Sequence, residues 1–228
     1  MPHQLNSHAG TKDHYRQLAS DYNQLANKTC EQYYQLLARR YLVGRSRVIE
    51  LGAGSSGLLK SIGSPLVVAS DLSYDMLAHR SADDPAGRVI AAGERLPFSD
   101  GTFDGLVSIN VLEHVADVEA VVAEAWRVLD DGGEWLAVTP NGNWEFWLDL
   151  AERWSLKLPE GPHKFLTTRE LAAVVSKRFE VVEHKTFFVF PCGPVPFARA
   201  LDRMTACSTW GWGFFQYQFA RKRPAASL

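Results

Sequence analysis

The chain has 228 residues, of which 46% are hydrophobic and 22% charged, a balance typical of a globular protein with a sizeable core. A net charge of −2 excludes an overall positive field that would attract nucleic acid or an anionic membrane. Three widely separated cysteines, Cys30, Cys192 and Cys207, form no C-x-x-C pair and predict neither a disulfide framework nor a zinc site. The polar first residues lack the apolar run of a secretory signal or a membrane span, so we expect a cytoplasmic protein.

Residues 12–42 have apolar side chains at helical spacing and predict two helices that are separated near Asn27. From residue 46 onward, short apolar runs alternate with helical segments. This alternation predicts an α/β fold in which a parallel sheet is covered by helices on both faces. The predicted strands are 46–51, 65–71, 87–92, 103–110, 133–141, 179–190 and 212–223, and the predicted helices are 55–63, 73–82, 115–133, 144–158 and 168–178.

No repeat, low-complexity segment or linker divides the chain, so residues 1–228 are expected to form a single domain. Within it we expect an N-terminal helical cap at 1–42, a cofactor-binding core at 46–141, and substrate-side insertions with the last strands at 142–228.

The segment VIELGAGSSG has glycines at 52, 54 and 57 with G-x-G-x-x-G spacing, and Asp71 follows where dinucleotide-binding proteins hold a ribose. Glu50 ends the strand before this loop. At ~5 Å and an effective dielectric constant of ~20, a carboxylate and one phosphate charge repel by about 3 kcal/mol. The same carboxylate suits a ligand with an ammonium and a sulfonium. The spacing alone permits either ligand, and the charge of Glu50 favours the cationic one.

Four segments, VIELGAGSSG, VVASDLSYDML, GERLPFSDGTFDGLVSINVLEHV and WRVLDDGGEWLAVTPN, resemble in order and spacing the motifs of class I S-adenosylmethionine-dependent methyltransferases. The resemblance covers residues 46–141. The later segments GPHKFLTTREL and FEVVEH are similar to the small-molecule branch that includes ubiquinone-biosynthesis O-methyltransferases. This resemblance implies a Rossmann-like, mostly parallel sheet of seven strands whose last strand, here 212–223, is antiparallel.

The resemblance also implies a binding site for S-adenosylmethionine. Asp71 would accept hydrogen bonds from both ribose hydroxyls, while Ala92 stands where an acidic residue usually reads adenine. The cofactor-binding residues implied are Glu50, Gly52, Ala53, Gly54 and Gly57 for the methionine portion, Asp71 for the ribose, Leu72, Met76, Gly93 and Glu94 for adenine, and Asn110, Val111 and Leu112 for the methionine side of the pocket.

Methyl transfer to oxygen needs alignment of the acceptor and removal of a proton, for which a histidine near neutrality is suited. His114 and His163 are the candidate bases, with packing roles as the alternative. Trp144 and Trp147 lie on an apolar stripe that favours a lid over the acceptor, and Tyr15 and Tyr22 are candidates to close the pocket, although core packing explains these aromatic residues as well. No Asp, Glu and His cluster indicates a metal site.

The sequence therefore predicts a methyltransferase that acts on a small apolar or aromatic acceptor at oxygen. Three alternatives remain: a nicotinamide-dependent oxidoreductase, a methyltransferase acting on protein or nucleic acid, and a non-catalytic cofactor-binding subunit. The basic run Arg221–Lys222–Arg223 is the feature that keeps nucleic acid among the alternatives.

Overall fold

The computed structural model describes residues 28–145, 164–187 and 213–224. The elements are α3 (Lys28–Leu42), β1 (Arg47–Leu51), the 3₁₀ helix η1 (Leu58–Ser61), β2 (Leu66–Asp71), α4 (Tyr74–Ala78), β3 (Gly87–Ile90), β4 (Phe103–Ile109), α5 (Val118–Val128), β5 (Leu129–Pro140), the 3₁₀ helix η2 (Gly142–Trp144), α7 (Thr168–Val175), β6 (Phe179–Phe187) and β7 (Phe215–Lys222).

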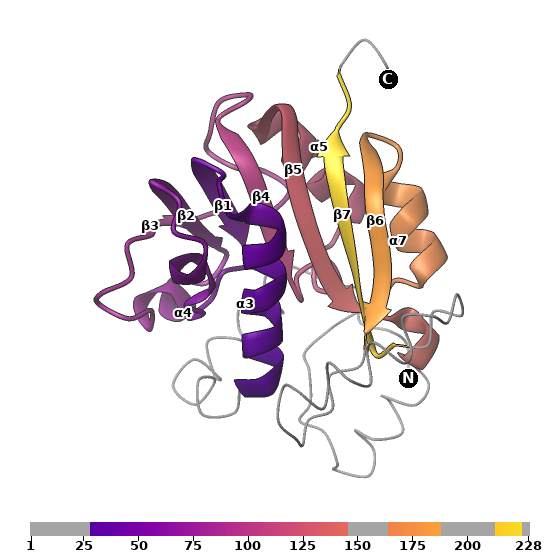
Figure 1. Cartoon of the computed structure of the whole chain (residues 1–228), viewed down its shortest axis with the longest axis horizontal. Coiled ribbons are helices and arrows are strands. Elements are labelled where there is room, and N and C mark those ends of the chain that lie inside the picture. Colours follow the sequence, from indigo (N-terminus) through magenta and orange to yellow (C-terminus); the bar gives the residue numbers. More distant parts are fainter. Residues whose placement is uncertain (1–27, 146–163, 188–212, 225–228) are drawn as a thin grey trace.

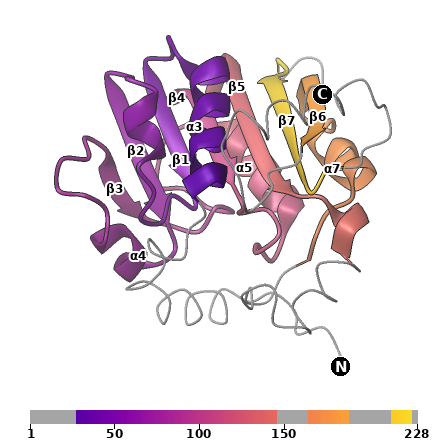
Figure 2. The ribbon, with the colours of Figure 1, turned by 60° about the horizontal axis from the view of Figure 1, so that its bottom comes forward.

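The strands form one seven-stranded sheet in the order β3-β2-β1-β4-β5-β7-β6 (Figure 1). Strands β1 to β5 pair in parallel, whereas β7 lies antiparallel to both β5 and β6. This arrangement confirms the Rossmann-like, mostly parallel sheet with an antiparallel last strand. The carboxyl ends of the parallel strands lie at the lower edge in Figure 1 and are turned forward in Figure 2.

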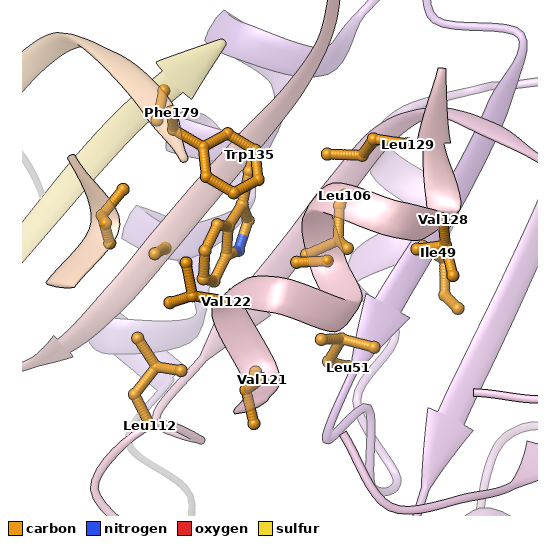
Figure 3. Packing of buried hydrophobic residues seen from close by; sticks show 14 of the residues in the cluster. Ile49, Leu51, Leu106, Leu112, Val121, Val122, Val128, Leu129, Trp135 and Phe179 are labelled. Carbon is orange, nitrogen blue, oxygen red and sulfur yellow. The ribbon is translucent and has the colours of Figure 1, made fainter. Parts of the chain in front are cut away.

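Two hydrophobic cores lie on opposite faces of the sheet. Helix α3 covers one face, where its Leu37 and Leu42 belong to the same cluster as Val48 and Val107 of the strands. Helices α5 and α7 cover the other face, where Trp135 contacts Phe179 with ring centroids 5.3 Å apart (Figure 3). Because consecutive side chains of a strand point to opposite faces, apolar residues in unbroken runs supply both cores.

Helix α3 is tied to the antiparallel end of the sheet by a polar cluster. The Tyr41 hydroxyl donates to Glu183 Oε2 at 2.7 Å and lies 2.9 Å from the Tyr217 hydroxyl, which itself donates to Glu183 Oε1 at 3.1 Å. Burial and the neighbouring Glu183 carboxylate raise the pKa of Tyr217 to about 12 against the lowering effect of the Tyr41 hydrogen bond, and burial also raises the pKa of Tyr41, so both phenols stay neutral at physiological pH. The cluster fixes α3 across the sheet.

Three predicted helices are clearly shorter than the sequence pattern indicates, among them the one at 73–82, of which α4 covers only Tyr74–Ala78. In place of a helix over 55–63 there is the four-residue η1, because the chain turns at Gly63 with φ +72° and Pro65 cannot continue a helix. Helix α5 ends at Val128 rather than near residue 133, since Leu129 has extended backbone and pairs with Phe103 of β4.

The helix predicted to begin after residue 27 is α3, and the one predicted at 168–178 is α7, which ends at Val175. The part of the helix 144–158 beyond residue 145 lies outside the described residues. None of the helices in the described segments has the length and apolar character needed to cross a bilayer.

Candidate functional site

A cavity of about 670 Å³ opens at the carboxyl ends of β1, β2 and β4. Its volume is in the range of sites that enclose ligands of drug or cofactor size. Parallel α/β sheets place their ligands at this edge because the loops after adjacent strands separate there. The described residues of the wall come from α3, the loop after β1, the end of β2 with α4, the segment after β3, the loop after β4, and the start of β7.

Glu50, near the end of β1, is 3% exposed and lies in the floor of the cavity. Its Oε1 accepts a hydrogen bond from the Ser56 hydroxyl at 2.9 Å, while its Oε2 is buried without a hydrogen-bond partner. Burial raises the pKa of Glu50 to about 8, and the Arg80 guanidinium, 3.8 Å from Oε2, opposes that rise. A buried carboxyl oxygen without a donor is suited to receive a donor from a ligand.

The glycine loop needs glycine at two of its three glycine positions. Gly52 and Gly54 have φ values of +61° and +48°, in the left-handed region that favours glycine. A Cβ at Gly52 would also lie 2.3 Å from Val111 Cγ2. Gly57 has φ −101° and open space around it, so the third glycine is not required by backbone geometry.

Asp71 closes β2 and faces the loop. Its Oδ2 accepts from the Gly54 backbone N–H and its Oδ1 from the Ser73 backbone N–H, both at 2.8 Å. Burial raises the pKa of Asp71, against the lowering effect of these two bonds. Since each carboxylate oxygen can accept more than one hydrogen bond, both retain capacity for a ligand hydroxyl. Ser73, not Asp71, caps α4, with its hydroxyl accepting from Met76 N at 3.3 Å.

Asn110 follows β4 in the left-handed region, with φ 53°, which is uncommon for a residue other than glycine. Its Nδ2 donates to the Tyr34 hydroxyl at 3.3 Å, and its Oδ1 is buried without a hydrogen-bond partner. Backbone strain of this kind is concentrated at functional sites. Among the described residues, no side chain or backbone group donates a hydrogen bond to Asn110 Oδ1 or to Glu50 Oε2, which has only the Arg80 guanidinium nearby at 3.8 Å.

The wall near α4 and β3 is formed by less polar residues. Leu72, Met76, Gly93 and Glu94 all line the cavity, as the sequence predicts. Ala92 also lies in the wall, at the position where the methyltransferases that the sequence resembles usually have an acidic residue.

Leu112 differs from the prediction. It is 1% exposed and packs beside Val121 and Val122 in the core under α5 (Figure 3). The chain turns after Asn110, so the cavity is lined by Val111 and the backbone then carries Leu112 to the opposite side.

Of the candidate catalytic residues, His114 lines the cavity beside Val115 and is half-buried. His163, Tyr15, Tyr22 and Trp147 lie outside the described residues. Trp144 ends η2 and packs against Phe214, with ring centroids 4.3 Å apart, but it is not part of the cavity wall.

The sequence gives no sign of several residues in or beneath the cavity wall. Tyr34 of α3 lines the cavity and reaches Asn110 across 76 positions. Arg80 lies beneath the glycine loop, outside the wall, and donates to the Ala53 and Gly54 carbonyl oxygens at 3.1 and 3.3 Å. Cys30 also lines the cavity, where burial raises the pKa of its thiol to about 11 and keeps it protonated. The contacts of Tyr34 and Arg80 join segments that are far apart in the chain, so the spacing of apolar residues along the sequence does not predict them.

The site has features that fit S-adenosylmethionine. The free acceptor atoms of Glu50 and Asn110 suit an ammonium, the Asp71 carboxylate suits a ribose diol, and the cavity is large enough for both. Among the described residues there is no group of three or more His, Cys, Asp or Glu side chains that could hold a metal ion.

Comparisons with known proteins agree with this geometry. The family model described as "Methyltransferase domain" matches residues 49–137. The malonyl-[acyl-carrier protein] O-methyltransferase of Geobacter sulfurreducens is 29% identical over 181 residues, which are 71% of this chain and 66% of that protein. A ubiquinone biosynthesis O-methyltransferase of Methylobacterium sp. is 35% identical over 144 residues, 60% of this chain and 51% of that protein. The chain thus spans between about half and two thirds of the length of these relatives.

Among solved structures, a S-adenosylmethionine-dependent methyltransferase from Thermotoga maritima, described as a possible histamine N-methyltransferase, has a TM-score of 0.71 at 20% identity. The match covers 92% of this chain and 98% of that one, and at this identity it shows the fold.

Fold and cavity define a Rossmann-like domain of the methyltransferase type. Residues 49–137 match the methyltransferase-domain family, and the similarity to named S-adenosylmethionine-dependent methyltransferases implies S-adenosylmethionine as the cofactor.

Proposed function

We propose that this protein transfers the methyl group of S-adenosylmethionine to an oxygen atom of a small apolar or aromatic acceptor. The observation that carries the proposal is the buried Glu50 carboxyl beneath a glycine loop that is followed by η1 rather than by an α-helix. Dinucleotide-binding proteins place a pyrophosphate at the N-terminus of an α-helix after such a loop. A four-residue 3₁₀ helix offers little dipole, and the Glu50 carboxyl supplies no positive charge and would repel a phosphate when ionised, so both features disfavour a nicotinamide cofactor.

The methionine portion is assigned to the end of β1 and the loop after β4. Glu50 Oε2 and Asn110 Oδ1 would accept hydrogen bonds from its ammonium. A bound ammonium favours the ionised carboxyl, so binding below pH 8 removes a proton from Glu50. The other residues proposed to surround this portion are Gly52, Ala53, Gly54, Gly57 and Val111.

The adenosine portion is assigned to the wall formed by β2, α4 and the segment after β3. Asp71, held in one orientation by the Gly54 and Ser73 N–H groups, would accept from the two ribose hydroxyls. Leu72 and Met76 would pack on adenine, and the Gly93 backbone with Glu94 would read its edge in the absence of an acid at 92.

When bound, the cofactor supplies a methyl group on a positively charged sulfur. The protein then has to orient the acceptor, exclude water and remove the acceptor's proton. His114 is the described side chain proposed to hold that proton, and His163 is the second candidate. The named O-methyltransferases among the relatives support oxygen as the accepting atom.

The basic run at the end of β7 gives little support to a nucleic-acid acceptor. Arg221 Nη2 donates to Glu134 Oε1 at 3.0 Å, and Lys222 Nζ donates to the Leu129 carbonyl at 2.6 Å while it lies 4.3 Å from the Trp126 ring centroid. These cations are already paired within the protein. Tight, salt-sensitive binding of RNA or DNA would contradict this part of the proposal.

Calorimetric titration tests the cofactor assignment. We expect S-adenosylhomocysteine to bind with micromolar or better affinity and NADH to show no binding. Glu50→Gln should weaken S-adenosylhomocysteine at least tenfold, because the neutral amide offers the ammonium no charge. The matched control is Glu119→Gln, an exposed residue of α5 outside the cavity. Binding of NADH without S-adenosylhomocysteine would overturn the proposal.

The acceptor can be identified by measuring transfer of the labelled methyl group from S-adenosylmethionine to each compound in a panel of phenols, carboxylic acids, amines and sugars. Product should form with an apolar phenol or carboxylic acid. His114→Gln should then lower kcat at least a hundredfold with little change in cofactor affinity. Unchanged turnover in this variant and in His114→Gln/His163→Gln would remove any base role from both histidines.

A further inference from the structure

The most unusual charged group outside the proposed ligand contacts is Arg80, two residues after the end of α4. Its side chain has no solvent exposure, although arginine is among the residue types least often fully buried. Its Nε donates to Asp84 Oδ2 at 2.8 Å, and its Nη1 lies 3.8 Å from Glu50 Oε2. Nη1 also donates to the carbonyl oxygens of Ala53 and Gly54.

Arg80 thereby holds the carbonyl groups of two successive peptides of the glycine loop, Ala53–Gly54 and Gly54–Ser55, and the first of these leads to the ribose carboxylate. In a planar trans peptide the C=O and the following N–H point in opposite directions. Because the Ala53 carbonyl oxygen points at Arg80, the Gly54 N–H points away from it, and this N–H donates to Asp71 Oδ2 at 2.8 Å. One peptide therefore links Arg80 to the carboxylate assigned to the ribose.

Arg80 also provides the nearest positive charge to Glu50. The groups that face Glu50 are the Arg80 guanidinium, the Ser56 hydroxyl, and the carboxylates of Asp84 and Asp71. Two negative neighbours and burial disfavour ionisation of Glu50, and Arg80 is the one cation among these neighbours that opposes them. A buried ion pair contributes little to stability compared with well-packed apolar residues, so its place under the loop calls for a functional reason.

We propose that Arg80 is a positioning residue for the cofactor, which fixes the Ala53–Gly54 peptide and supplies the positive charge that eases ionisation of Glu50 when the methionine ammonium binds. This inference rests on the proposed assignment of the cavity to S-adenosylmethionine. Arg80 does not itself contact the ligand, since it acts from beneath the loop through Glu50 and the loop carbonyls.

The test compares two ligands that differ in the methionine portion. S-adenosylhomocysteine has the ammonium, whereas 5′-methylthioadenosine keeps the adenosine and the sulfur without it. Dissociation constants are measured by calorimetry at pH 6.0, 7.0 and 8.0 for wild type, Arg80→Met and Arg80→Lys. The matched control is Arg88→Met, because Arg88 donates to the backbone oxygens of Arg80 and Ser81 from an exposed position.

We expect Arg80→Met to weaken S-adenosylhomocysteine at least tenfold at pH 6.0 and 7.0 and to recover part of that loss at pH 8.0. Its effect on 5′-methylthioadenosine should be less than threefold and independent of pH. Arg80→Lys keeps the charge and loses the forked hydrogen bonds, so it should keep the wild-type pH profile with a loss of a few fold. Arg88→Met should stay within twofold of wild type.

An equal loss of affinity for both ligands at every pH in Arg80→Met would show that Arg80 has only a structural role and would overturn the inference. Wild-type affinity in Arg80→Met would also overturn it. If Arg80→Met does not fold, the Arg80→Lys variant provides the test. An equal loss of affinity for S-adenosylhomocysteine and 5′-methylthioadenosine in this variant, or a pH dependence of affinity that differs from wild type, contradicts the inference. Failure of the wild-type protein to bind S-adenosylhomocysteine would instead contradict the cofactor assignment, and the inference with it.

Discussion

Glu50, the residue proposed to receive the methionine ammonium, lowers the stability of the ligand-free protein as the pH rises. Its pKa is raised from 4.5 to about 8 by burial, so between these pH values the folded state holds a proton that the unfolded state releases. Because unfolding releases this proton, the free energy of unfolding decreases as the pH rises. The contribution of Glu50 to stability therefore falls from about pH 4.5 to 8 and is constant above that range.

Glu50→Gln should remove this dependence because the amide does not ionise. We expect the free energy of unfolding of the variant, relative to wild type, to rise by up to about 1.4 kcal/mol per pH unit between pH 5 and 8. Urea denaturation of the ligand-free proteins at four pH values measures it. Parallel pH curves for the two proteins would show that Glu50 is ionised in the folded state throughout, which contradicts the prediction.

At the scale of elements, the turn from β1 to η1 contains two glycines, Gly52 and Gly54, whose positive φ values require glycine, and one, Gly57, whose backbone any residue could adopt. Gly52→Ala combines a positive φ with a Cβ 2.3 Å from Val111 Cγ2, and the clash would displace the loop after β4 as well. We expect loss of S-adenosylhomocysteine binding by at least a hundredfold, measured by calorimetry.

Gly57→Ala is the matched control for this loop. At φ −101° a Cβ meets only Lys60 Cδ, at 4.0 Å, so affinity should stay within about threefold of wild type. If the two variants lose affinity equally, then the loop adopts a different backbone when the ligand is bound.

For the whole molecule, the cavity joins segments that are far apart in the chain, from Cys30 of α3 to Phe215 of β7. A ligand in it should therefore stabilise the sheet and α3 together. At 100 times its dissociation constant a ligand adds about 2.7 kcal/mol, which for a chain of this size raises Tm by roughly 5–10 °C.

Thermal denaturation with S-adenosylhomocysteine should show this increase in Tm, and NADH at the same concentration should leave Tm unchanged. An equal shift with both compounds would point to binding through the adenosine alone, without the discrimination assigned to Glu50.

The sequence by itself determined the features that depend on near neighbours along the chain. Apolar runs of strand length predict all seven strands, and the order of motifs places Glu50, Asp71 and Asn110 at strand ends, where the cavity lies. These features follow from local periodicity, because side-chain alternation and turn glycines are set within a few residues.

The surroundings of these residues depend on how the whole chain packs. This packing reduced the helix after the glycine loop to η1, turned Leu112 into the core, and brought Arg80 and Tyr34 to the site. The reason is physical: a buried charge or a cross-sheet hydrogen bond depends on which distant segment packs against it. Those pairings are chosen by the packing of the whole sheet and its helices, and no window of the sequence contains both partners.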